Sequence, residues 1–203
     1  MCQIAKLDYS KEYVLEDDFV KLTPLAESHI LPLSKISKDA EIWKYFFEQG
    51  DTVPTLTNYI KKAIKNRTLA KEHPYAVFDK RCGKFAGTTR WYEYSDDLKT
   101  VKLGHTWYGK PFRGSGINRH CKYLLFEFAF ERLEVERIGF GAYIDNLVSV
   151  AAMKSVGCQK EGVLKNVFPA IEGNGRTDAI LMSILKDDWS RKVKSELTTK
   201  IYT

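Results

Sequence analysis

Residues 107–118 read Trp-Tyr-Gly-Lys-Pro-Phe-Arg-Gly-Ser-Gly-Ile-Asn, and they join a β-rich segment to a strongly apolar helical one. At such a junction the first N–H groups of the helix have no partner within the helix. The helix dipole adds positive potential there, and glycines let a ligand approach the backbone closely. A strand, a glycine-punctuated loop and a helix start therefore predict a phosphate-binding cradle.

This loop is weakly specific by itself, and a plain turn is the alternative interpretation. It is not a Walker loop, because no Gly-Lys-Ser/Thr follows, and it lacks the GxGxxG of a dinucleotide site. Lys110, Arg113 and Arg119 are placed to add charge-assisted hydrogen bonds to an anion.

Downstream, the pattern predicts a helix through Leu133 that is apolar on two sides and therefore packed on both. Cys121 lies on one of these stripes. A strand over 137–144, a helix over 146–156 ended by Gly157, and strands over 161–168 and 177–185 follow. Gly173-Asn174-Gly175 lies in the connection of the last two, which is typical of a long hairpin loop.

Upstream, the predicted elements are a strand over 19–22, helical structure over 26–38 that Pro32 disturbs, and a helix capped by Asp39 through Phe47. Thr55 is a candidate cap for an amphipathic helix. Strands over 75–79, 85–94 and 100–108 come next, joined by short turns. The whole order predicts an α/β (α+β) fold with one mixed, mostly antiparallel sheet and helices on both faces.

The chain has 203 residues, of which 44% are hydrophobic and 29% charged, as in a soluble globular protein. We expect one domain over 15–190, with an N-terminal arm over 1–14 and a C-terminal tail over 191–203.

The net charge of +6 favours an anionic ligand or an acidic polypeptide, with a solvated basic surface as the alternative. Nucleic acid is not expected, because no segment clusters Lys and Arg with aromatic residues.

The four cysteines lie far apart and form no CxxC pair, so neither a zinc site nor a disulfide framework is expected. The start of the chain lacks the pattern of a signal peptide, and no apolar run approaches the ~18 residues of a membrane span. These features favour a cytoplasmic protein, with the nucleus left open.

Residues 113–118, Arg-Gly-Ser-Gly-Ile-Asn, resemble the acetyl-CoA loop R/Q-x-x-G-x-G/A of the GNAT superfamily of N-acetyltransferases. Arg113 and Gly116 match, whereas Asn118 stands where Gly or Ala is usual. Residues 146–157 are similar to the second GNAT signature, N-x-x-A/S ending in Gly. Further segments match in order over roughly residues 14–190, and the whole resembles the RimJ/RimL-type branch.

The resemblance implies a strand pair that splays, so that the pantetheine arm of acetyl-CoA, the co-substrate, pairs with the backbone at the end of the strand. It also implies a pyrophosphate on the loop and contact with Asn146, although an asparagine there is equally a helix cap. The implied cofactor-binding residues are Trp107, Tyr108, Arg113, Gly114, Ser115, Gly116, Ile117, Asn118, Arg119, Asn146, Ser149 and Met153.

The implied reaction is direct attack of an amine on the thioester through a tetrahedral intermediate. The acceptor would be a protein N-terminus or a small amine, bound by residues 26–69 and the loop around Gly173. His105, expected to share one strand face with Leu103 and Trp107, is the first candidate base, and a packed structural histidine is the alternative. Further candidates are Glu93, Tyr92 and Tyr143.

Several positions depart from the family pattern. Met153 stands where many members carry a tyrosine that protonates the leaving thiolate, and Ser149 is the nearest hydroxyl. Lys102 and His120 replace common glutamates, which predicts a more positive pocket. These departures leave open an acyl-CoA-binding protein without turnover, while the charge alone leaves open a ribosome- or RNA-associated protein. No metal is expected, and the oligomeric state is open, a homodimer included.

Overall fold

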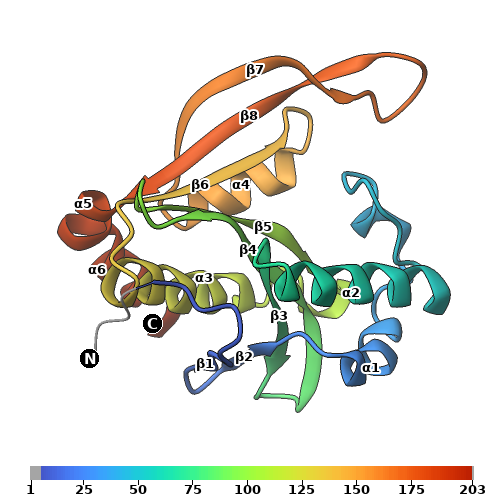
Figure 1. The fold of residues 1–203 in the computed structure, drawn as a ribbon, viewed down its shortest axis with the longest axis horizontal. Helices are drawn as coiled ribbons and strands as arrows, with labels where there is room; N and C mark the ends of the chain where they lie inside the picture. Colours follow the sequence, from blue (N-terminus) through green and yellow to red (C-terminus); the bar gives the residue numbers. More distant parts are fainter. Residues whose placement is uncertain (1–5, 203) are drawn as a thin grey trace.

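Eight strands lie side by side in one sheet in the computed structural model, which describes residues 6–202 (Figure 1). Their order across the sheet is β1-β2-β3-β4-β5-β6-β8-β7. The strands are β1 (Leu15–Glu16), β2 (Val20–Pro24), β3 (Glu72–Asp79), β4 (Lys84–Ser95), β5 (Thr100–Tyr108), β6 (Arg137–Tyr143), β7 (Gln159–Pro169) and β8 (Arg176–Leu185).

The pairing between β5 and β6 is parallel, whereas all the other neighbours in this sheet are antiparallel. The parallel ladder covers only three residue pairs, from Thr100↔Arg137 to Lys102↔Gly139. Beyond them β5 and β6 continue without pairing to each other, so the two strands separate. The predicted mixed sheet with a splayed central pair is confirmed.

Helices cover both faces of this sheet, as predicted. Along β3 the side chains alternate: Tyr75 and Val77 belong to the larger core cluster, and Ala76 to the smaller one. The larger cluster packs under α3, α4 and α6, and the smaller under α1 and α2. The helical segments are η1 (Glu27–His29), α1 (Ile30–Ser34), η2 (Ala40–Ile42), α2 (Val53–Thr68), η3 (Lys110–Phe112), α3 (Ile117–Glu127), η4 (Phe128–Arg132), α4 (Leu147–Ser155), α5 (Lys186–Asp188), η5 (Trp189–Val193) and α6 (Lys194–Tyr202).

Two upstream helices differ from the prediction. Asp39 does accept a hydrogen bond from the N–H of Glu41, but only the 3₁₀ turn η2 follows, in place of a helix through Phe47. α2 begins at Val53, because Thr52 caps it by accepting the N–H of Thr55. Pro54 fits the first turn, where its missing N–H costs no hydrogen bond.

The described parts of the expected arm and tail both pack against the larger core cluster. Leu7 and Tyr13 are buried near the start, and Leu197 and Ile201 near the end. α6 lies against α3. The remaining residues of these two segments, 1–5 with Cys2 and 203, lie outside the described residues.

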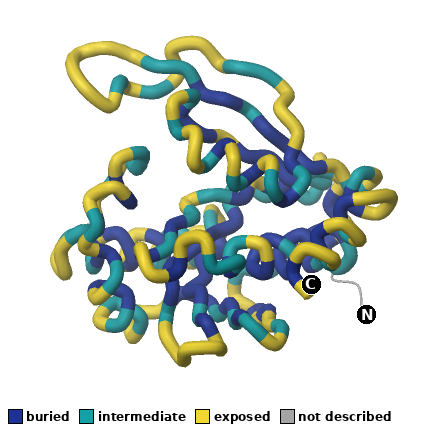
Figure 2. The backbone as a smooth tube through the Cα atoms, turned by 180° about the vertical axis from the view of Figure 1, so that it is seen from behind, coloured by how far each residue is buried: buried dark blue, intermediate teal, exposed yellow. Residues whose placement is uncertain are grey.

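Burial is concentrated between the helices and the sheet, while most of β7 and its connection to β8 is exposed (Figure 2). The β7–β8 hairpin extends away from the body of the molecule (Figure 1). The predicted hairpin connection around Gly173 is confirmed. No helix within residues 6–202 is long and apolar enough to cross a membrane.

Candidate active site

The glycine loop leads from the end of β5 into α3. Gly114 and Gly116 adopt left-handed backbone angles, with φ of +72° and +86°. Gly116 is the N-cap of α3 and supplies no capping side chain. Within the described residues no protein group accepts a hydrogen bond from the backbone N–H groups of 114–118. These donors, together with the helix dipole, form a site for an anion.

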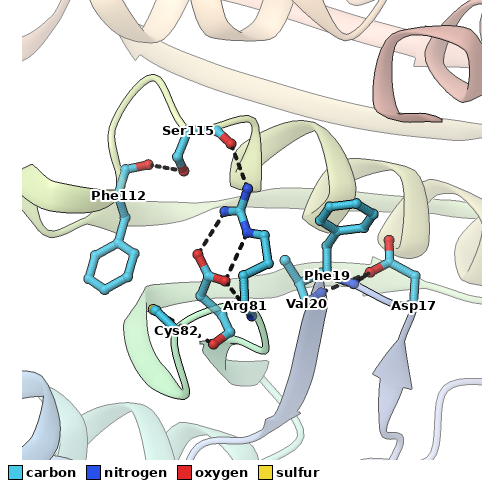
Figure 3. A network of polar contacts seen from close by, with 8 residues as sticks. Asp17, Phe19, Val20, Arg81, Cys82, Phe112 and Ser115 are labelled. Carbon is cyan, nitrogen blue, oxygen red and sulfur yellow. Dashed lines mark hydrogen bonds and ion pairs between the residues drawn. The ribbon is translucent and has the colours of Figure 1, made fainter. Parts of the chain in front are cut away.

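Two arginines hold this loop in place. The Arg113 side chain turns back: its Nε donates to the carbonyl of Tyr108 over 3.1 Å, and Nη1 lies 3.1 Å from Asp39. Arg81, from the β3–β4 turn, donates from Nη1 to the carbonyl of Ser115 over 3.1 Å (Figure 3). Its other nitrogens form a fork on the buried carboxylate of Asp79. The loop is therefore preorganised by protein contacts.

The first turn of α3 is anchored by a buried pair. Nδ1 of His120 lies 2.7 Å from Oδ2 of Asp17, and both side chains are almost fully buried. The other Asp17 oxygen accepts the N–H groups of Phe19 and Val20 (Figure 3). His120 was expected to make the pocket more positive. It is instead matched by a carboxylate at the junction with β2.

A bulge in β5 changes the predicted side-chain alternation. Thr88 pairs with Trp107 and Arg90 with Gly104. An advance of two residues along β4 therefore corresponds to three residues along β5, which is one extra residue in β5. His105 lies in this bulge with φ of +48°. As a result Leu103 faces the larger core cluster and Trp107 the smaller one. The prediction that His105, Leu103 and Trp107 share one face is wrong, because the extra residue reverses the alternation.

The surroundings of His105 make it a poor proton acceptor. Its ring packs edge-on against Tyr92 at 5.4 Å and near Phe46 at 6.3 Å between centroids. The residue is exposed by surface area, yet the protein packed around the ring lowers its pKa to about 3, with further contributions from Arg90 and Lys62. Burial raises the pKa of Tyr92 to about 12. Both side chains are therefore neutral near pH 7.

Three further predicted site residues, Glu93, Asn146 and Met153, contact other parts of the protein. Glu93 is exposed and lies 2.5 Å from the ammonium of Lys102. Lys102 was expected, like His120, to make the pocket more positive, and the carboxylate of Glu93 offsets its charge. Asn146 caps α4, with its Oδ1 accepting the N–H of Ser149 over 3.1 Å. Met153 is buried in the larger core cluster.

Aromatic residues from three distant segments meet at the end of β6. Tyr143, at the end of β6, stacks on Phe168 of β7 with ring centroids 4.5 Å apart. From the segment before α2, Tyr45 contacts Tyr143, and Phe47 contacts both rings. Residues 26–69, from which one part of the acceptor pocket was expected, therefore meet β7 here. The loop around Gly173, the other expected part, connects β7 to β8.

Sequence reasoning missed Arg81, the Asp39 partner of Arg113, and Lys122. Lys122 lies in α3 with only 5% of its surface exposed, and its Nζ donates to Oγ1 of Thr106 over 3.1 Å. A lysine inside a helix that is apolar on two sides was the available signal for it. The contacts of Arg81 with Ser115 and of Asp39 with Arg113 join residues far apart in sequence and have no local signal.

No group of three or more His, Cys, Asp or Glu side chains within residues 6–202 could hold a metal ion. The three cysteines of that range, Cys82, Cys121 and Cys158, are free thiols.

Comparisons with known proteins agree with this fold. The family model of the acetyltransferase (GNAT) domain matches residues 20–159. The chain therefore belongs to the GNAT family, and N-acetyl transfer is the class of reaction that this membership assigns to it. The predicted superfamily is confirmed.

Individual relatives extend over most of the chain. The uncharacterized N-acetyltransferase YnaD of Bacillus subtilis is 24% identical over 155 residues, which cover 76% of this chain and 86% of YnaD. A GCN5-related N-acetyltransferase from Brucella melitensis superposes with a TM-score of 0.84 at 20% identity, covering 96% of this chain and 87% of that one. Mycobacterium smegmatis RimJ in complex with CoA-disulfide gives 0.76 at 18% identity, covering 93% of each chain. The chain thus shares its fold with RimJ and with this GCN5-related N-acetyltransferase.

Proposed function

We propose that this protein binds acetyl-CoA between the splayed strands β5 and β6 and transfers the acetyl group to an amine, either a protein N-terminus or a small molecule. The observation that carries the proposal is the set of unpartnered N–H groups over 114–118, at the N-terminus of α3, beside an unpaired strand edge. A RimJ structure with the same fold is in complex with CoA-disulfide, which supports a CoA compound as the ligand.

The residues present fit such a co-substrate. The free N–H groups and the helix dipole suit a pyrophosphate. The edge of β5 beyond Lys102 has no strand partner on the β6 side, so its backbone can pair with the amides of a pantetheine arm. Trp107, Tyr108 and Asn118 would flank that arm; Oη of Tyr108 and Oδ1 of Asn118 already lie 3.4 Å apart. Ser149 and Met153 would border it from α4.

Acetyl-CoA would supply the acetyl group as an activated thioester. On the protein side, the acceptor would enter along the aromatic cluster of Tyr45, Phe47, Tyr143 and Phe168. We propose that His105 acts in its neutral form, as a hydrogen-bond partner for the amine or for a water that removes the proton, because its lowered pKa makes it a weak base.

The test of the co-substrate site is the thermal midpoint with and without acetyl-CoA, in wild type and in Gly116→Trp. Ligand at ~100 times its Kd adds about 2.7 kcal/mol of stability, which is an easily measured shift. Gly173→Trp is the matched control, because Gly173 also has a positive φ, of +75°, and open space around it, but lies in the β7–β8 connection.

We expect acetyl-CoA to raise the midpoint of wild type and of Gly173→Trp, and to leave that of Gly116→Trp unchanged. If wild type does not respond to acetyl-CoA, to free CoA or to longer acyl-CoAs, the proposed co-substrate site is wrong.

A second candidate function is binding of acyl-CoA without turnover. It is favoured by Met153, which offers no proton to a leaving thiolate, and by the low pKa of His105. Release of CoA in the presence of a panel of amines and peptides separates the two. Release above the hydrolytic background supports the enzyme, and ligand binding with no release across the panel supports the binding protein.

A further inference from the structure

Lys122 is a buried cation with little to balance its charge. Its side chain comes from the second turn of α3, and its ammonium donates to the hydroxyl of Thr106, while the Phe140 ring centroid lies 5.9 Å away. No carboxylate within residues 6–202 lies within ion-pair distance of it. An ammonium carries three donors, so this contact leaves much of its hydrogen-bonding capacity unused.

This arrangement is unfavourable for folding alone. Burying a charge without a counter-ion costs several kcal/mol, and a methionine or leucine of similar volume fits an apolar helix face at no such cost. The neighbours of Lys122 in the helix are core residues: Cys121, Leu125 and Phe126 are fully buried. A lysine at this position therefore indicates a ligand that pairs with its ammonium group.

The position of the ammonium identifies that ligand. Thr106 lies on β5 and Phe140 on β6, and both come after the last paired residues, Lys102 and Gly139. Nζ of Lys122 thus lies between the splayed strands, on the side of α3. An arm that runs from the glycine loop toward the closed end of the splay passes Thr106 on its way.

We propose that Lys122 binds the sulfur end of coenzyme A and stabilises its thiolate when the acetyl group leaves. This rests on the proposed function. When the amine nitrogen forms its bond to the acetyl carbon, the carbon–sulfur bond breaks and its electron pair stays on sulfur. The ammonium of Lys122 pairs with this thiolate or gives it a proton, and Lys122 then regains a proton from solvent. The proton that the acceptor amine loses goes to water.

The electrostatics support this role. Burial lowers the pKa of Lys122 to about 8, close to the ~8.5 of an ordinary thiol, so that a proton can pass between them with little loss of free energy. The titratable groups that face it are thiols. Burial raises the pKa of Cys121 and of Cys158 to about 12, so both stay neutral. Burial also keeps the nearby Tyr108 phenol protonated.

The test compares the binding of free CoA with that of desulfo-CoA, which lacks the sulfur, by calorimetry at pH 6.5 and pH 8.5 in wild type and Lys122→Met. Thermal midpoints without ligand are measured alongside. Lys160→Met, an exposed lysine of β7, is the matched control. Lys122→Arg restores the charge and is the second variant in case Lys122→Met does not fold.

We expect wild type and Lys160→Met to prefer CoA over desulfo-CoA by about tenfold or more at pH 8.5, a difference of about 1.4 kcal/mol. The preference should be smaller at pH 6.5, where less thiolate forms, nearly absent in Lys122→Met and largely kept in Lys122→Arg. Without ligand, Lys122→Met should melt at the same temperature as wild type or higher, because an unbalanced buried charge is removed.

A merely structural role for Lys122 predicts the opposite pattern: a lower midpoint without ligand and an unchanged preference for the sulfur. That result overturns the proposal for Lys122 while leaving acetyl-CoA binding intact. If wild type binds neither CoA nor desulfo-CoA, the proposed function fails together with it.

Discussion

The packing around His105 and His73 lowers the pKa of each ring well below its ordinary value. The sequence suggests His105 as a base because an unperturbed imidazole titrates near neutrality. In the folded chain its pKa falls to about 3. His120 is paired with Asp17, and His73 is fully buried beneath the rings of Tyr13 and Tyr75. Such environments depend on residues far away in the chain, so the sequence identifies the candidates without deciding their protonation.

His73 gives a prediction for stability against pH. Burial lowers its pKa to about 4, partly opposed by the hydrogen bond between Nε2 and the carbonyl of Lys11. Between about pH 6.5 and pH 4 the imidazole is protonated in the unfolded chain and neutral in the folded chain. The free energy of unfolding therefore falls as the pH falls. His105 acts in the same direction.

We therefore expect His73→Phe, which keeps a ring in place, to lose less stability than wild type on acidification. Between pH 7 and pH 5 the difference in the loss of unfolding free energy should be about 2 kcal/mol, measured by urea denaturation at both pH values. Equal losses in the two proteins would show that His73 titrates normally.

At the scale of single elements, the strands were more predictable than the helices before them. β5 was predicted with the limits it has, Thr100–Tyr108. The bulge within it was not, because it exists only relative to the residue count of β4. Residues 39–47 contain good helix formers and a real cap. The chain leaves the helix after Ile42, however, and the aromatic side chains of Trp43 and Phe46 pack over Tyr59 of α2.

The glycine loop is the element on which the candidate site depends, and its position was predictable from local sequence. The contacts that hold the loop in place were not predictable in this way. Arg81 reaches it from the turn between β3 and β4, a contact over 34 positions in the chain. The loop is therefore held on one side by β5 and on the other by a hairpin that has no part in the family motif.

We expect Arg81→Lys to weaken acetyl-CoA binding by about five- to tenfold, because lysine cannot bond Asp79 and Ser115 with one fork. The buried Asp79 carboxylate keeps a positive partner, so the loss of unfolding free energy should stay near 1–2 kcal/mol. Calorimetric titration and urea denaturation measure the two effects. Arg191→Lys, in an exposed pair with Asp187, is the control and should change neither.

For the whole molecule, the predicted class, sheet type and arrangement of helices on both faces are confirmed, since they follow from the order of elements. The structure of the expected tail over 191–203 was harder to predict. Periodicity gave little sign of η5 and α6, yet Val193, Leu197 and Ile201 are buried in the larger core cluster. α6 covers α3, the helix whose N-terminus forms the proposed phosphate site.

If α6 belongs to the domain, Leu197→Ala should cost about 2–5 kcal/mol of unfolding free energy, as a core leucine does. Glu196→Ala, one residue away in an exposed ion pair with Lys192, should cost no more than about 0.5 kcal/mol. Urea denaturation of the two variants checks this. A negligible effect of Leu197→Ala would mean that the end of the chain is an appendage.

The short parallel ladder between β5 and β6 also divides the sheet according to the chain. Strands β1 to β5 come from the first part of the sequence, and β6, β8 and β7 from the last, so each antiparallel group is built from one continuous part of the chain. Three residue pairs, from Thr100↔Arg137 to Lys102↔Gly139, join the two groups within the sheet. Because most strand pairing lies inside one group or the other, each group can acquire its register independently.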